Sequence, residues 1–161
     1  MKPIKLHSFV IFSLLLFILF YSHADAQSAG TNQFGLRIGG FSGITFRHVN
    51  NNNVAVQADL LENYRGYWTL ISAMAEKHIP LNEGFVLYFG GGIFLGGNRD
   101  PYYIKEDLHY WSPAFGLEGV FGADYYFEHV PLNLGLDVTP RFSFFYDPFP
   151  WDAAISLRYI F

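Results

Sequence analysis

The sequence predicts an all-β fold, in which eight antiparallel strands in up-and-down order close into a transmembrane β-barrel after a cleaved signal peptide. Three observations favour this fold class. Apolar and polar residues alternate along most of the chain after residue 26, breaks rich in Asn, Gly or Pro separate the alternating segments, and the last segment ends on an aromatic residue. Side chains point alternately to the two faces of a strand, so each segment can separate lipid from a polar interior.

The amino-terminal segment has the pattern of a secretory signal peptide. Lys2 and Lys5 precede an apolar run over 9–21, and small residues at Ala24 and Ala26 favour cleavage before Gln27. The run is shorter than the roughly 20 residues of a membrane-spanning helix. We therefore expect a signal peptide over 1–26 and a β-barrel domain over 27–161.

The alternating segments define the expected strands. They cover 33–41, 42–49, 54–62, 67–79, 85–95, 112–127, 132–145 and a last strand that closes at Phe161. Short turns are expected at 50–53, 80–84 and 128–131, and the longest connection over 96–111. With the amino terminus in the periplasm, the three short turns lie on the periplasmic side and the longest connection lies outside.

Charged residues share one face of these strands and are expected to point into the barrel. Gln57 joins this predicted lumen network, whose charged members are Arg37, Arg47, Asp59, Glu76, Glu118, Asp124, Asp137, Arg141 and Arg158. An eight-stranded barrel has room inside only for side chains, and unpaired buried charge is costly. We expect the charges to pair, Arg158 with Glu118 among them, and to plug the lumen. The alternative is a porin-like selective channel or a proton path.

Composition excludes several function classes. Without Lys2, Lys5 and Asp25 the net charge changes from −4 to −5, which argues against nucleic acid as a partner. The chain has no Cys, so thiol chemistry and disulfides are absent. The glycines at 90–92 lack the Lys-Ser/Thr of a phosphate-binding loop. His48, His78, His109 and His129 have no metal-ligand spacing, so we expect them to be solvated or interfacial, with no metal and no cofactor.

The expected outer connection holds the best candidate binding residues. Its mixed charges and aromatic rings suit contact with a sugar or a protein, and the candidates are Arg99, Tyr102, Tyr103, Lys105, Tyr110 and Trp111. The aromatic residues could equally belong to the girdle at the membrane surface. His109, Ser112, Asp100 and Asp107 are close in sequence, but no nucleophile motif surrounds Ser112, so we expect no enzyme activity and no catalytic residues.

Four segments resemble the small outer-membrane β-barrel proteins of Gram-negative bacteria, particularly their short Bacteroidetes-type members. These segments are 35–49, 88–97, 131–140 and 156–161, the last reading S-L-R-Y-I-F. The resemblance implies location in the cell outer membrane, contact with its lipid, and delivery by periplasmic chaperones to the barrel-assembly machinery. It also implies that Tyr159 and Phe161 belong to the assembly signal that this machinery reads.

The resemblance is weak for activity and leaves several roles open. We expect a non-enzymatic protein of the cell envelope with a structural or surface-interaction role, whose extracellular ligand or protein partner is unknown. The peptidoglycan-binding domain of larger relatives is expected to be absent. The alternatives are an accessory component of a secretion or gliding apparatus, a barrel-type outer-membrane enzyme, and a soluble lipocalin-like binder. The last would carry apolar residues inside, contrary to the expected inward charges.

Overall fold

The computed structural model describes residues 30–63, 67–82, 84–99, 111–144 and 151–161. The predicted signal peptide over 1–26 lies outside the described residues. Every regular element in the described ranges is a strand, and none of these residues forms a helix that is long and apolar enough to cross a bilayer.

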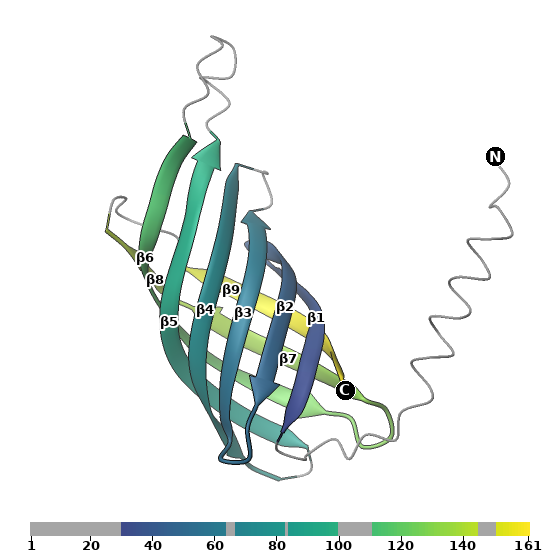
Figure 1. The fold of residues 1–161 in the computed structure, drawn as a ribbon. Coiled ribbons are helices and arrows are strands. Elements are labelled where there is room, and N and C mark those ends of the chain that lie inside the picture. The colour runs from purple at the N-terminus through teal and green to yellow at the C-terminus, as the bar shows by residue number, and fades with distance from the viewer. Residues whose placement is uncertain (1–29, 64–66, 83, 100–110, 145–150) are drawn as a thin grey trace, which may run out of the picture.

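Eight antiparallel strands close into a barrel, which confirms the predicted fold class (Figure 1). Each strand pairs with its neighbour in the chain, and the last strand pairs with the first, so the ring of eight has no free edge. The strands are β1 Thr31–Gly39, β2 Phe41–Val49, β3 Val54–Asn63, β4 Trp68–Pro80, β5 Phe85–Arg99, β6 Trp111–Tyr126, β7 Leu132–Thr139 and β9 Asp152–Ile160.

A ninth strand, β8 Arg141–Ser143, stands outside the ring of eight and follows β7 after Pro140. The seventh strand was predicted as one segment over 132–145, but Pro140 has no backbone N–H to donate and interrupts it. The register continues across the break, because Val138 faces Phe121 and Arg141 faces Glu118. The Pro140 carbonyl still accepts a 2.9 Å hydrogen bond from the N–H of Gly119.

The turns after β2, β4 and β6 lie at one end of the barrel, here called the end of the short turns, whereas the Arg99 and Trp111 ends of β5 and β6 lie at the other, together with the one-residue turn at Gly40 (Figure 1). The turn between β2 and β3 shows why its sequence is Asn-rich. The Asn50 side chain accepts hydrogen bonds from the N–H groups of Asn52 and Val54, and Asn53 adopts a φ of 56°. The prediction that β5 ends at residue 95 is wrong: the strand continues to Arg99, which pairs with Trp111.

The polarity of the barrel is the reverse of that of a water-soluble protein. Burial alternates along the strands, and the large apolar residues of the outer wall are exposed, as in Leu36 at 58% and Leu136 at 61%. The inner wall carries the charges, and the side chains of Arg37, Arg47 and Arg158 are at most 1% exposed. Apolar surface therefore surrounds an ionic core.

Candidate functional site

Arg47 of β2 lies at the centre of the lumen and contacts side chains from four other strands. Its guanidinium lies 2.5 Å from Asp124 and 3.1 Å from Glu76, and its Nε donates a 2.9 Å hydrogen bond to Gln57. The guanidinium carbon also lies 4.6 Å from the centre of the Tyr88 ring, within cation–π range. One buried cation thus ties together β2, β3, β4, β5 and β6.

Arg158 of β9 shares two of these partners. It donates hydrogen bonds to Asp124 at 3.3 Å, to Gln57 at 3.3 Å and to Asn133 at 3.1 Å. Asp124 therefore lies between two arginines and binds each through a different oxygen atom. A carboxylate can accept several such bonds at once, which suits it to join the two cations.

A second group of charges surrounds Arg37 of β1. Its Nη1 donates to both oxygens of Asp137, at 2.6 and 2.7 Å, and its Nη2 donates to Thr139 and to Asp152. The Tyr88 hydroxyl donates to the same Asp137 at 3.1 Å. Tyr88 therefore contacts the groups of both Arg37 and Arg47, and the two groups form one network.

Glu118 pairs with Arg141 of β8, across a distance of 3.0 Å. The predicted pairing of Arg158 with Glu118 is wrong, because Arg158 is bound to Asp124 instead. Alternation places both side chains in the lumen, but it does not give their heights. Those depend on the stagger between tilted strands around the ring.

Acidic side chains outnumber arginines in the described lumen. Asp59 forms no ion pair with an arginine among the described residues; it accepts hydrogen bonds from the Gln57 amide at 2.9 Å and the Ser72 hydroxyl at 3.5 Å. The buried carboxylates are Asp59, Glu76, Glu118, Asp124, Asp137 and Asp152, against the arginines Arg37, Arg47, Arg141 and Arg158. The network is therefore acidic as well as paired.

Apolar side chains fill the lumen beyond the ionic network. At the end opposite the short turns, Phe41, Leu61, Leu70, Phe94 and Ala114 form one buried cluster. At the end of the short turns, a second cluster contains Val86, Tyr126 and Ile160. The described lumen side chains thus form a largely ionic middle with a mainly apolar cluster toward each end.

All nine charged residues predicted for the lumen are buried there, and the structure adds two that the prediction missed. Asp152 is 2% exposed and lies 3.3 Å from Arg37. Asp152 lies on the same face of β9 as Ser156 and Arg158. Extending the predicted last strand toward residue 152 would therefore have placed it in the lumen.

His78 is the second addition, and its predicted solvated or interfacial position is wrong. It is 3% exposed, its Nε2 lies 3.0 Å from Glu76, and its ring stacks on Tyr88 at 5.5 Å. The strand predicted over 67–79 already included residue 78, so its alternation with Met74 and Glu76 could have placed His78 on the inward face. His48 and His129 are exposed, whereas His109 lies outside the described residues.

The candidate surface-binding residues are only partly described. The backbones of Arg99 and Trp111 pair at the ends of β5 and β6. Tyr102, Tyr103, Lys105 and Tyr110 lie outside the described residues, as do Asp100 and Asp107. Tyr159 and Phe161, the predicted assembly residues, have stacked rings 6.3 Å apart, and Phe161 is 60% exposed.

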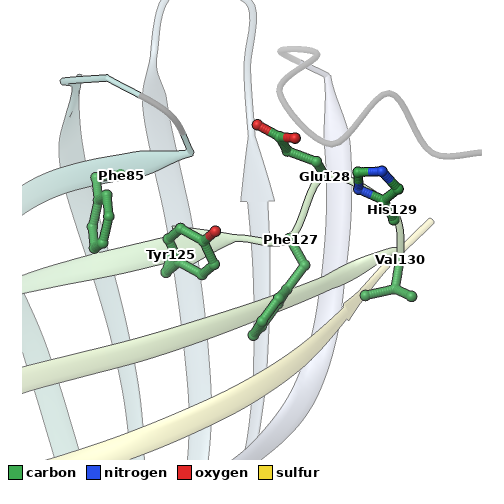
Figure 2. A pocket seen from close by; sticks show the side chains of 6 residues that line it. All are labelled: Phe85, Tyr125, Phe127, Glu128, His129 and Val130. Atoms are coloured by element: carbon green, nitrogen blue, oxygen red, sulfur yellow. The ribbon is translucent and has the colours of Figure 1, made fainter.

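A hollow of about 430 Å³ lies at the end of the barrel that carries the short turns. Phe85, Tyr125 and Phe127 line it together with Glu128, His129 and Val130. Figure 2 shows the three rings along the ends of β5 and β6, with Glu128 and His129 on the turn that follows β6. Within the described ranges, no group of three or more acidic, His or Cys side chains could hold a metal ion.

Comparison of the sequence with protein-family models and with curated proteins finds no match. The function must therefore be inferred from the barrel itself.

Proposed function

We propose that this protein is a non-enzymatic integral β-barrel of a bacterial outer membrane, with a structural or surface-interaction role in the cell envelope. The observation that carries the proposal is the reversed polarity of the barrel. Exposed Leu, Ile or Phe side chains lie on the outer wall of every strand in the ring, while four arginines and six carboxylates are buried inside. Such a surface is stable against hydrocarbon and would aggregate in water.

The closed ring supports the same conclusion. In a bilayer every backbone N–H and C=O must find a partner within the protein, and a closed antiparallel barrel provides one for each strand edge. A soluble lipocalin-like binder would need the opposite arrangement, with apolar residues around an internal cavity. The buried arginines and carboxylates argue against that alternative.

The filled lumen favours a structural or surface role over transport. Ions and solutes would have to displace Arg47, Asp124 and their partners, which are held by several short hydrogen bonds. The apolar clusters at either end add two further barriers. We therefore propose that ions and solutes do not diffuse through the barrel, and that the protein acts through its outer surfaces.

Site-directed spin labels test the proposal in cells or reconstituted vesicles. A label at Leu157, which is 50% exposed on β9, should be accessible to oxygen and protected from a water-soluble paramagnetic reagent. A label at Asn52, exposed in the turn between β2 and β3, is the control and should show the reverse. Water access at position 157, or a mature protein that stays soluble without detergent, would contradict membrane insertion.

A further inference from the structure

The hollow at the short-turn end presents a cluster of aromatic rings. The ring of Tyr125 lies between those of Phe85 and Phe127, at centroid distances of 4.7 and 5.0 Å, and meets the Phe127 ring edge-on at 84° (Figure 2). Aromatic ring faces are electron-rich, so a face in this cluster that its neighbours leave uncovered attracts a cation placed over it.

The turn after β6 adds polar groups of complementary kinds. Glu128 and His129 line the same hollow and are exposed. In the part of the chain that the structure describes, no cation pairs with Glu128. A free carboxylate beside aromatic rings favours an ammonium group, and a histidine N–H can donate to a phosphate oxygen.

The hollow lies on the outer wall of the barrel. Phe85 is 53% exposed, and two outward pairs further along β5 and β6, beyond Leu87 and Ala123, Phe89 and Phe121 are 48% and 63% exposed. An apolar stripe therefore runs from the hollow along β5 and β6, and the turn over 127–131, which carries Glu128 and His129, borders the hollow on its other side. If the barrel spans a membrane as proposed above, this is the depth where acyl chains give way to headgroups.

We propose that this hollow binds a phospholipid with an ammonium-bearing headgroup. The ammonium contacts the rings and Glu128, the phosphate accepts a hydrogen bond from His129, and an acyl chain follows Phe89 and Phe121. A phospholipid of this class supplies all three kinds of group in one molecule. A purely anionic headgroup offers no cation to the rings and is repelled by Glu128.

A titration of the full chain folded in non-ionic detergent tests this site. Short-chain phosphatidylethanolamine should give saturable shifts in the backbone amide resonances of 125–130, and phosphatidylglycerol of the same chain length should bind at least about fivefold more weakly. E128Q should weaken phosphatidylethanolamine binding by about fivefold. E62Q is the matched control. Glu62 is an exposed carboxylate on β3, near the end of the barrel away from the hollow, so its substitution should leave binding unchanged.

A second variant, F127L, removes a ring while it keeps apolar volume, and it should also weaken binding. Heat-dependent gel mobility verifies that each variant is folded. Equal binding of phosphatidylglycerol, wild-type affinity in E128Q, or shifts that spread along the outer wall without saturation would overturn the proposal. Equal binding of free ethanolamine would overturn it as well, since a soluble amine would then suffice. Failure of membrane insertion is a separate result, detected by the spin labels and not by this titration.

Discussion

Asp124 holds the two most deeply buried arginines of the lumen in place, so its loss should be costly. Its carboxylate contacts Arg47 and Arg158, both 0% exposed. D124A would leave two buried cations with fewer partners, and we expect it to lower the free energy of unfolding by about 3–5 kcal/mol. Urea unfolding in micelles, followed by tryptophan fluorescence, measures the change.

The control for D124A is E62A, which removes a carboxylate from the exposed face of β3. Surface substitutions of this kind usually change stability by less than about 0.5 kcal/mol. Equal effects of the two variants would show that the lumen network does not stabilise the barrel.

Gly122 is needed because the lumen is crowded around Tyr88. A Cβ at this position would lie 2.5 Å from the ring carbon that bears the Tyr88 hydroxyl and 2.7 Å from the Cβ of Asp137. Tyr88 cannot move away freely, because its hydroxyl is bonded to Asp137. We expect G122A to destabilise the barrel by about 1–3 kcal/mol, as overpacking of a filled interior does.

The matched variant is G119A, on the outer wall of the same strand. Its added Cβ would come no closer than 3.4 Å to the Pro140 ring, an ordinary contact. Thermal unfolding of the two variants side by side separates crowding in the lumen from a general effect of alanine in β6. A barrel that tolerates G122A as well as G119A would have spare room inside.

The strands are the part of the structure that sequence predicts best. Alternation places Asp137 inside and Leu136 outside β7 without any knowledge of neighbouring strands, because adjacent residues must point to opposite faces. Pro140 divides the seventh strand because it lacks an N–H group, a local property that could have been read from the sequence. The partner of each charge could not be read, since it depends on the stagger of all strands around the ring.

The outer side of β7 gives a test of the proposed membrane insertion. Leu136 lies in the middle of the strand and is 61% exposed, while Leu81 lies in the turn before β5 and is 53% exposed. L136R should destabilise the barrel in phospholipid vesicles by about 2–4 kcal/mol, and L81R by at most about 1 kcal/mol.

Both leucines are exposed to a similar degree, so a protein that stays in water should respond to the two arginines alike. Equilibrium unfolding from vesicles, measured for both variants, decides between these outcomes. Similar effects would argue against a bilayer around β7.

At the scale of the whole molecule, the barrel has its charged side chains inside and its apolar side chains outside, the reverse of a water-soluble protein. Its interior is held by hydrogen bonds and ion pairs that cross between strands distant in sequence, as Arg37 does to Asp137 and Arg158 to Gln57. Such a network gains its strength only when all members are present, because each partial assembly leaves buried charge unpaired. We infer that closure of the ring through β1 and β9 and formation of the lumen network depend on each other.

The filled lumen predicts that the inserted barrel does not conduct ions. Side chains from all eight strands occupy the interior, and largely apolar clusters containing Phe94 at one end and Ile160 at the other make entry of a hydrated ion costly. Planar-bilayer recordings of the purified protein should therefore show no stepwise currents, while a porin inserted under the same conditions provides the positive control. Protease protection of the reconstituted strands establishes that the silent protein has inserted. Regular current steps that disappear on heat unfolding would mean that the ionic network opens, and would replace a structural role with transport.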